Sequence, residues 1–530
     1  MKRFISLLVV LTLALTCVTL PVFADEAQDE PDVFTAFIDE DADVLIEGNK
    51  VVEWFEEKAN VKFDFIQSTG DEMLTLLLST GDYPELFLTS FSNNDIINYG
   101  VSSGIFVPID EYIDEHAPNI KAYLDQNEVF ARNIVAPDGH IYGVPQLPAL
   151  LSHGNVGSKM WINTTWLERL GLEMPQTTDE LYEVLVAFRD GDPNGNGIND
   201  EIPLSGCINT WDAEPEYALM NSFIMTDKAN FVTIEDGAVK FVATDDRYRE
   251  GLRYIKKLYD ENLLDPACFT QDLNQLIQLG QNPDIEILGC YACGHVGMAL
   301  NLEDRERSEM YNALVTPAGP DGERYIKYYD PNNASGTAFA ITDVCHDVAR
   351  ALEVIDLMYT EEVSICGEFG LKGELWDDAP EGMIDFLGNP ALYTVTGTRV
   401  EQHTEMRDNY FGAFRKCDTQ RTKYAVVSED IYSSDTQPYE LRLTRATQEY
   451  LQYKPDETMP VIWADEEAAA LQSQLSVTIV DYVKQATTRF ITGDMSIDND
   501  WDAYVDALNG MNLAQYVKYY EDGYAAAKAK

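Results

Sequence analysis

The chain has 530 residues, of which 45% are hydrophobic, and its 91 acidic and 37 basic side chains give a net charge of −54. A chain of this length exceeds what one hydrophobic core usually supports, so we expect at least two domains. Such an acidic surface repels nucleic acid and anionic lipid, which argues against both as partners, and it also disfavours a polyanionic ligand.

Residues 1–24 have the pattern of a secretory signal peptide. Lys2 and Arg3 precede an apolar run that is too short to span a membrane, and a small-residue cleavage site ends at Ala24. We therefore expect export with cleavage after Ala24, which removes two basic residues and changes the net charge from −54 to −56. The alternative is lipid attachment at Cys17, although Thr16 fits the position before such a cysteine poorly.

From residue 33 the chain alternates predicted strands and helices. Strands are expected at residues 33–38, 61–66 and 85–89 from their β-branched and aromatic content, and helices at residues 46–59 and 72–78. This alternation predicts an open, largely parallel α/β lobe. A turn at 138–139 then leads into a predicted hairpin at residues 141–145.

The middle of the chain continues the α/β pattern. A strand ends near Asn163, and helices follow at residues 166–170 and from Thr177, which forms a capping box with Glu180. An Asp-Gly turn marks a hairpin within residues 231–242. The later predictions are a helix at 248–262, strands at 295–300, 312–317 and 337–341, a helix at 348–359, and a helical region from residue 466.

Residues 190–203 have the ligand order of a calcium loop. Asx residues alternate before a glycine, and two acids end the run, so oxygen ligands can surround one Ca²⁺ ion. The ligand candidates are Asp192, Asn194, Asn196, the main-chain carbonyl of Ile198, Asp200 and Glu201. Because Pro203 stands where an EF-hand carries its bidentate Glu, Glu201 takes that role. The alternative is a surface turn without metal.

A family resemblance becomes specific at this point. Residues 161–172 read Trp-Ile-Asn-Thr-Thr-Trp-Leu-Glu-Arg-Leu-Gly-Leu, and Pro175, a Thr-Thr-Asp-Glu-Leu run and the loop follow. This stretch resembles the family 1 extracellular solute-binding proteins of bacterial carbohydrate ABC importers, in particular the alginate-binding proteins and sugar-binding lipoproteins of Gram-positive bacteria. The resemblance implies that the loop holds a structural Ca²⁺ far from the sugar.

The resemblance also implies the fold, a two-lobed α/β architecture of the type II periplasmic-binding-protein class with a hinge and a ligand cleft between the lobes. The expected order is a first lobe at 25–148, a second lobe at 149–334, a return to the first lobe at 335–385, and a helical part of the second lobe at 386–530. The implied partners are an oligosaccharide and the permease subunits of an ABC transporter, with the protein itself a monomer.

Aromatic side chains are the candidate sugar contacts, because an apolar sugar face packs on an aromatic ring. Trp161, Trp211 and Trp376 stand in or beside expected loops, and Tyr328 lies at the second crossing between lobes. Core packing is the alternative for each ring. Asn163 falls where the alginate binders carry a basic residue, and its lack of charge favours a neutral oligosaccharide.

Sequence features typical of enzymes are weaker than those typical of a binding protein. Gly-Val-Ser-Ser-Gly at 100–104 matches the nucleophile elbow of α/β-hydrolases, but helix, loop and strand follow one another there in the reverse order. The histidines show no metal-ligand spacing, and a dockerin-like module would carry two calcium loops. With seven cysteines after cleavage and one Cys-x-x-Cys, we expect buried free thiols. The predicted function is oligosaccharide capture for an importer without catalysis, and a secreted carbohydrate hydrolase is the alternative.

Overall fold

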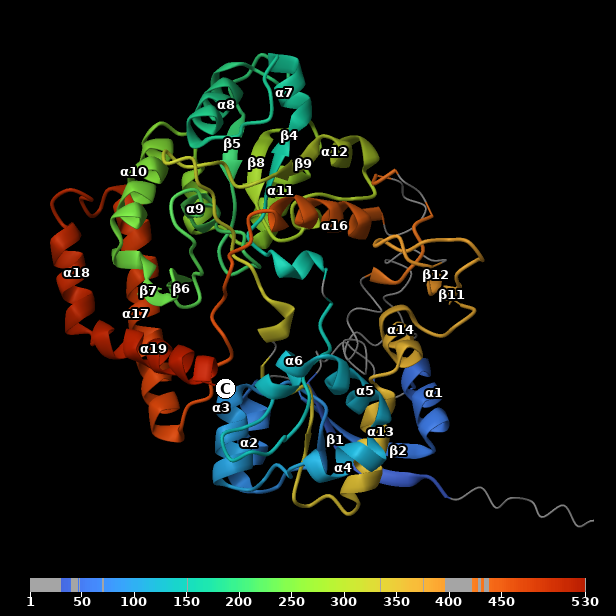
Figure 1. Cartoon of the computed structure of the whole chain (residues 1–530). Coiled ribbons are helices and arrows are strands. Elements are labelled where there is room, and N and C mark those ends of the chain that lie inside the picture. Colours follow the sequence, from blue (N-terminus) through green and yellow to red (C-terminus); the bar gives the residue numbers. More distant parts are fainter. Residues whose placement is uncertain are drawn as a thin grey trace, which may run out of the picture.

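The computed structural model describes residues 30–39, 46, 48–68, 71–149, 151–333, 335–374, 376–395, 422–427, 430–432 and 438–529. The predicted signal peptide, with Cys17 and Ala24, lies outside these residues. Two α/β lobes, each built on a four-stranded sheet, lie one above the other in Figure 1, and several chain segments pass between them.

The first lobe is built on a sheet of order β10-β3-β1-β2. Its strands are β1 (Asp32–Asp39), β2 (Val61–Ser68), β3 (Leu86–Phe87) and β10 (Ala340–Ile341). The first three are parallel, and β10 runs antiparallel to β3. Phe34, Ala36 and Ile38 of the central strand enter the core. The predicted strands of this lobe are confirmed, although β3 and β10 are shorter than expected.

Helices cover both faces of this sheet. They are α1 (Lys50–Ala59), α2 (Asp71–Thr80), α3 (Asn93–Asp95), α4 (Asp110–His116), α5 (Pro118–Gln126), α6 (Glu128–Asn133), α13 (Val348–Leu357) and α14 (Glu361–Phe369). Helix α1 begins later than the predicted residue 46, because Asn49 caps it by accepting hydrogen bonds from the backbone N–H groups of Val51 and Val52.

The second lobe is built on a sheet of order β5-β8-β4-β9. Its strands are β4 (Met160–Asn163), β5 (Ile202–Ser205), β8 (Leu288–Ala292) and β9 (Tyr311–Leu314). Strands β5 and β8 are parallel, and β4 runs antiparallel to both β8 and β9. Its flanking helices include α7 (Thr164–Leu170), α8 (Thr178–Asp190), α9 (Pro215–Met220), α10 (Asp246–Asp260), α11 (Leu273–Gly280) and α12 (Arg305–Glu309).

The predicted local signals of this lobe are confirmed. Thr177 and Glu180 form the capping box of α8. The hairpin of β6 (Val232–Glu235) and β7 (Ala238–Phe241) turns at Asp236 and Gly237, which both have positive φ as a two-residue turn requires.

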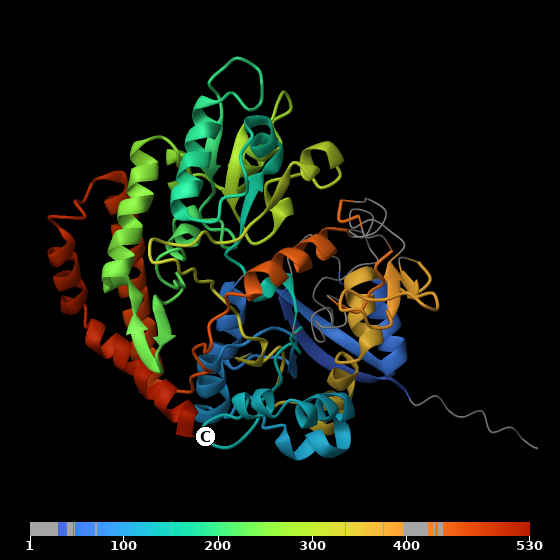
Figure 2. The same cartoon turned by 45° about the horizontal axis from the view of Figure 1, so that its top comes forward.

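The C-terminal helices extend the core of the second lobe. They are α16 (Pro438–Leu451), α17 (Glu466–Thr492), α18 (Trp501–Gly510) and α19 (Leu513–Ala529). Ile479, Val483 and Phe490 of α17 join the same hydrophobic cluster as α8 and α10. In both views α17 to α19 form one side of the molecule, and α19 reaches the neighbourhood of α3 in the first lobe (Figures 1 and 2).

Two of the segments that join the lobes carry residues discussed below. The first crossing contains the short helix η2 (His153–Asn155), between Leu147 in one core and Met160 in the other. The second crossing runs from residue 326 to residue 337. The two crossings pair through backbone hydrogen bonding, because the N–H of Tyr329 donates to the carbonyl of Asn155 at 2.8 Å.

The structure differs from the predicted lobe boundary at residue 385. Strand β12 (Tyr393–Val395) pairs with β11 (Trp376–Asp378), and Tyr393, Val395 and Tyr424 pack against Val51 of α1. The described residues between the second crossing and residue 427 therefore belong to the first lobe. Asp430 and Tyr432 already contact Arg305 and Asn312 of the second lobe, and α16 packs there as well.

One predicted strand and one predicted hairpin are wrong. Residues 295–300 contain the short helix η5 (Val296–Met298) rather than a strand, and the strand of this region is β8, which precedes it. Residues 141–145 form no hairpin in the structure: they are held by single hydrogen bonds, as from Ile109 N–H to the Ile141 carbonyl.

In the part of the chain that the structure describes, no helix has both the length and the apolar character needed to cross a bilayer.

Candidate functional site

The strand directions of the second lobe bring several loops to one edge of its sheet. The carboxyl ends of β5, β8 and β9 lie there with the amino end of β4, because β4 is antiparallel to its neighbours. Ligands of open α/β sheets bind outside the carboxyl ends of strands. The residues that follow β5 and β8, and those that precede β4, are therefore the candidates for a site that faces the first lobe.

Trp211 is the aromatic platform at this edge. It follows β5, and its indole ring is half-buried over Gly294, where a Cβ would lie 2.5 Å from the ring. Gly157 gives similar room, because a Cβ there would lie 2.9 Å from the indole nitrogen. The imidazole of His153 lies 5.7 Å from the indole, centroid to centroid. Two glycines thus let a large ring lie close against the backbone while one part of it stays exposed.

Buried charges lie beside this ring. Asp212 is buried with φ of +46°, and its Oδ1 lies 3.4 Å from Nζ of Lys327. Lys327 also contacts Asp227 at 3.0 Å, and Lys228 pairs with Glu214. Although burial lowers the pKa of Lys327, the two carboxylates of Asp227 and Asp212 raise it above its usual value. Each lysine of this cluster is therefore compensated by a carboxylate.

A buried lysine underlies the cluster. Lys159 has no exposed surface, and its Nζ donates to the backbone carbonyl of His153 at 2.8 Å and to that of Val156. Burial lowers the pKa of the Lys159 ammonium to about 7, while Asp212 acts in the opposite direction. This amine fixes the first crossing segment to the start of β4.

The crossings place further polar groups at the same edge. Nδ1 of His153 lies 3.1 Å from Oε2 of Glu440 on α16, the helix that lies between the lobes in Figure 1. Tyr329 is 42% exposed, and its ring lies 4.6 Å from Nζ of Lys327. The edge therefore combines two partly exposed rings with hydrogen-bonding groups next to the segments that join the lobes.

The predicted sugar contacts divide between this edge and the core. Trp211 is partly exposed at the edge. Tyr328 is partly buried in the second crossing, where it packs against Val156 and Tyr450. Trp161 has no exposed surface, and its Nε1–H donates to the Cys293 carbonyl at 3.0 Å. Asn163 is also fully buried, and its Oδ1 accepts from the N–H of Trp166 to cap α7. Trp376 is 4% exposed in the first lobe, within the cluster formed with β12.

No local pattern in the sequence indicated Asp212, His153 or Lys327 as site residues, whereas Tyr329 stands beside Tyr328 among the aromatic residues of the second crossing. A usable signal was nevertheless present for Asp212. Once β5 is placed by its position after the calcium loop, the residues after it fall at the carboxyl end of a strand, where ligands gather. The two crossing segments could be joined to that edge only by the pairing of Tyr329 with Asn155, which no local pattern encodes.

The predicted calcium loop connects α8 to β5 at the opposite edge of the sheet. The two carboxylate oxygens of Asp192 accept from the N–H of Gly197 at 3.2 and 3.1 Å. The side-chain amides of Asn194 and Asn196 donate to Asp200 at 2.9 and 3.0 Å. The described residues contain no group of three or more His, Cys, Asp and Glu side chains arranged to hold a metal.

Glu201 supplies the test of whether this loop fits a cation. Both of its carboxylate oxygens are buried and form no hydrogen bond of normal geometry within the described residues. Burial raises the pKa of Glu201, nearby backbone N–H groups lower it, and the carboxylates of Asp200 and Asp192 raise it. A buried, unpartnered carboxylate among two other acids fits a Ca²⁺ ligand, because a cation would replace the lost hydration.

The features that suggested an enzyme have structural roles. Gly100 and Ser102 lie within the π-helix η1 (Ile96–Ser102), and the hydroxyl of Ser103 donates to the carbonyls of Asn98 and Tyr99. The residues therefore do not form a strand-turn-helix nucleophile elbow. Cys290 and Cys293 are buried free thiols, and burial raises the pKa of each.

Comparisons with known proteins agree with this architecture. A model described as bacterial extracellular solute-binding protein matches residues 27–364. The fructooligosaccharide ABC transporter substrate-binding protein FusA of Streptococcus pneumoniae serotype 4 is 27% identical over 492 residues, which cover 90% of this chain and 87% of that protein. The polygalacturonan/rhamnogalacturonan-binding protein YtcQ of Bacillus subtilis is 22% identical over 91% of this chain and 89% of that protein.

Solved structures confirm the two-lobed type II fold. FusA of S. pneumoniae in complex with kestose has a TM-score of 0.74 at 25% identity, over 94% of this chain and 100% of that one. An EF-hand mutant of FusA with fructo-nystose gives the same values. An extracellular solute-binding protein from Bifidobacterium longum subsp. infantis has a TM-score of 0.76 at 21% identity, over 94% and 98% of the two chains.

Proposed function

The chain belongs to the family of bacterial extracellular solute-binding proteins, and we propose that it captures a neutral oligosaccharide between its lobes for an ABC importer. The single observation that carries the choice of ligand is the half-buried ring of Trp211, held over Gly294 at the carboxyl edge of the second sheet. A sugar places its apolar C–H face on such a ring, and its hydroxyls reach the polar groups around it. Tyr328 and Tyr329 supply further contacts.

The charges at this edge support a neutral ligand. Lys327 lies 3.0 Å from Asp227, and Lys228 pairs with Glu214. Lys327 and Lys228 thus already have carboxylate partners, and the fully buried Lys159 donates to backbone carbonyls. A uronate would have to displace one of these partners, whereas a neutral oligosaccharide would not. This supports a ligand like the fructooligosaccharides named for FusA over the polygalacturonan named for YtcQ.

Lobe closure is the proposed mechanism of capture. The Trp211 edge belongs to one lobe, and only a closed arrangement lets a ligand contact the other lobe as well. The ligand then favours the closed state by its greater affinity for that state. The permease would recognise the closed form and receive the ligand unchanged, so the protein is proposed to act without catalysis and as a monomer.

For the loop after α8 we propose a structural Ca²⁺ ion. The side chains of Asp192, Asn194, Asn196, Asp200 and Glu201 and the main-chain carbonyl of Ile198 would hold it. The unpartnered carboxylate of Glu201 supports this assignment, and so does the EF-hand named for FusA. The ion would stiffen the connection between α8 and β5, with the modest affinity, on the order of 10⁻⁴ to 10⁻³ M, of extracellular sites.

The proposed site of action is extracellular, which membership of a family of extracellular solute-binding proteins supports. Cleavage after Ala24 is the proposed route to a released protein, and attachment through Cys17 would instead give a surface lipoprotein. Mass spectrometry of the exported chain separates the two, because only the second carries a lipid on its N-terminal cysteine.

The proposal is tested by calorimetric titration of the exported protein with kestose, nystose, other neutral oligosaccharides and a digalacturonate. We expect binding of a neutral member and a rise in stability of about 2.7 kcal/mol at 100 times its dissociation constant. Trp211→Ala should weaken binding by roughly 10-fold or more, because aromatic contact contributes on the order of 1 kcal/mol beyond area burial.

Trp54→Ala is the matched control, since this ring is partly buried on α1 of the first lobe, where Lys58 packs over it. Preference for the digalacturonate, or equal affinity in the Trp211 variant and the control, would contradict the proposed site. Chromatography of the sugar after long incubation separates binding from hydrolysis, and only an unchanged sugar agrees with the proposal.

A further inference from the structure

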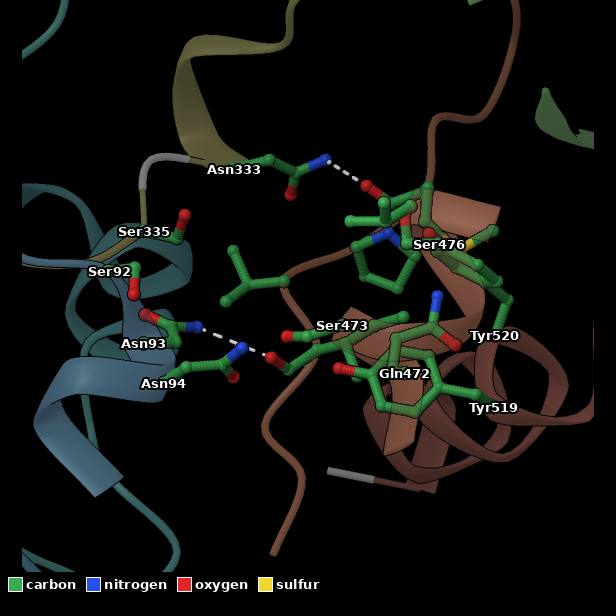
Figure 3. Close-up of a pocket in the computed structure, with 15 residues that line it drawn as sticks. Ser92, Asn93, Asn94, Asn333, Ser335, Gln472, Ser473, Ser476, Tyr519 and Tyr520 are labelled. Atoms are coloured by element: carbon green, nitrogen blue, oxygen red, sulfur yellow. Dashed lines mark hydrogen bonds between the residues drawn. The ribbon is translucent and has the colours of Figure 1, made fainter. Parts of the chain in front are cut away.

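A cavity, called the second cavity below to set it apart from the Trp211 edge, lies between the lobes beside the C-terminal helices. It has a volume of about 600 Å³, within the usual range for small-molecule sites. In Figure 3, Asn93 and Asn94 of α3 and Asn333 of the second crossing lie on one side of it, and Gln472 and Ser476 of α17 and Tyr520 of α19 lie on the other. None of the residues of the Trp211 edge lines it.

The chemistry of this cavity is uncharged. Of its 15 lining residues, ten carry amide, hydroxyl or phenol groups and five are apolar. None of these described lining residues is Asp, Glu, Lys, Arg or His, although charged residues make up 24% of the chain. A charged ligand would lose its hydration there without a counter-charge. A neutral ligand with many hydroxyls would find donors, acceptors and two phenol rings.

Gln472 is a buried polar group in this wall whose hydrogen bonding within the protein is incomplete. Its side chain is 8% exposed, and neither its Oε1 nor its Nε2 forms a hydrogen bond of normal geometry within the described residues. The hydroxyl of Tyr520 lies nearby. An unsatisfied buried amide costs about 1–3 kcal/mol, and a turn of the Gln472 side chain toward the cavity would let a ligand hydroxyl recover it.

The two walls belong to different lobes. The Nδ2 of Asn93 donates to the Ile462 carbonyl at 3.3 Å, and Trp463 Nε1–H donates to the Asn133 carbonyl at 2.9 Å, so the segment before α17 is fixed to the first lobe. In contrast, α19 is fixed to the second lobe, where the Tyr516 hydroxyl donates to the Asn230 carbonyl at 2.9 Å. A ligand in this cavity therefore contacts both lobes.

We propose that this cavity is a second carbohydrate site, for a neutral mono- or disaccharide, separate from the Trp211 edge. Amide groups from α3 and α17 would bind the hydroxyls, and the phenol ring of Tyr520 would contact an apolar face of the sugar. The proposal does not depend on which oligosaccharide occupies the main cleft.

Trp211→Ala protein, in which the main site is impaired, allows this second site to be measured by calorimetry with sucrose, maltose and glucuronate at millimolar concentration. We expect one weak site per chain for sucrose or maltose and none for glucuronate. Adding Ser476→Trp, which fills the cavity, should weaken this binding at least roughly 10-fold. Adding Thr478→Trp, at an exposed position of the same helix, should leave it unchanged.

Absence of neutral disaccharide binding in the Trp211→Ala protein would overturn the proposal, and so would binding that the Ser476→Trp change leaves intact. Where that change lowers the melting temperature, Gln472→Ala is the second variant and should also weaken binding. If the weak site is absent but oligosaccharide still binds in a Trp211-dependent way, the proposed main function is unaffected. If oligosaccharide binding were lost in Ser476→Trp and unaffected by Trp211→Ala, the result would instead contradict the Trp211 site.

Discussion

At the scale of single residues, Gly294 controls the position of the ring on which the sugar is proposed to lie. A Cβ at residue 294 would lie 2.5 Å from the Trp211 ring, and the three nearest atoms all belong to that indole. We therefore expect Gly294→Ala to displace the ring and to weaken oligosaccharide binding roughly 10-fold in a calorimetric titration. Gly510→Ala in α18, which meets open space, is the control. Equal affinities in the two variants would contradict this placement of the ring.

Glu216 gives the protein a pH dependence of stability. It is fully buried in α9, and burial raises the pKa of its carboxyl from 4.5 to about 8, although a backbone N–H lowers it. The folded chain therefore holds a proton that the unfolded chain has lost. This contribution to stability is complete below pH 4.5 and is lost as the pH rises toward 8, at up to about 1.4 kcal/mol per pH unit.

Glu216→Gln should remove this loss, because glutamine is neutral throughout. Denaturant unfolding between pH 5 and 8 is the measurement. The free energy of unfolding of the variant, taken relative to wild type, should rise steadily with pH. Glu521→Gln, on the exposed face of α19, corrects for the change in total charge. A difference between Glu216→Gln and wild type that does not vary with pH would show that Glu216 does not titrate in this way.

At the scale of elements, the loop between α8 and β5 is expected to couple calcium to stability. Glu201 has both carboxylate oxygens buried without hydrogen bonds of normal geometry. Added Ca²⁺ should raise the melting temperature of the protein, and a chelator should reverse the rise. In Glu201→Gln the ion should bind more weakly and the rise should shrink or vanish, because one anionic ligand is lost.

Asp190→Asn is the control for this experiment, because Asp190 pairs with Arg189 at the end of α8 and is not among the proposed ligands. It should keep the calcium response of the wild type. An equal response to calcium in Glu201→Gln would contradict the assignment of Glu201. Oligosaccharide affinity at saturating calcium should be the same in all three proteins, since the loop lies at the sheet edge opposite Trp211.

Elements with a local physical signal could be predicted from the sequence. Helix α8 has a capping box at Thr177, and the hairpin of β6 and β7 has an Asp-Gly turn that supplies the required positive φ. Strand β8 has no such signal, because it contains Gly289, which strand propensity disfavours. The glycine is required by packing, since a Cβ there would lie 2.6 Å from Phe188 and 2.8 Å from the Pro203 carbonyl.

The candidate site was harder to predict than the fold. Trp211 could be proposed from its place in a loop, but the same reasoning proposed Trp161, whose ring the pairing of β4 with two neighbours buries. Burial of a ring depends on partners far along the chain. The interaction of Asp212 with Lys327 likewise joins residues 115 positions apart, which no single-sequence pattern shows.

At the scale of the whole molecule, the chain passes from the first lobe to the second later than the sequence indicated. After the second crossing, the described residues up to 427 belong to the first lobe, because β11 pairs with β12 and both pack on α1. The second lobe takes the C-terminal helices, which extend back toward the first lobe beside α3 (Figures 1 and 2). Both the Trp211 edge and the second cavity therefore lie where relative motion of the lobes would change their shape.

Small-angle X-ray scattering during titration with the neutral oligosaccharide that binds most tightly is the most direct test of capture between the lobes. The account predicts that the radius of gyration falls as the site fills, with a midpoint that follows the calorimetric affinity, and that Trp211→Ala needs correspondingly more sugar for the same fall. Saturation of the site with an unchanged radius of gyration would contradict capture by lobe closure.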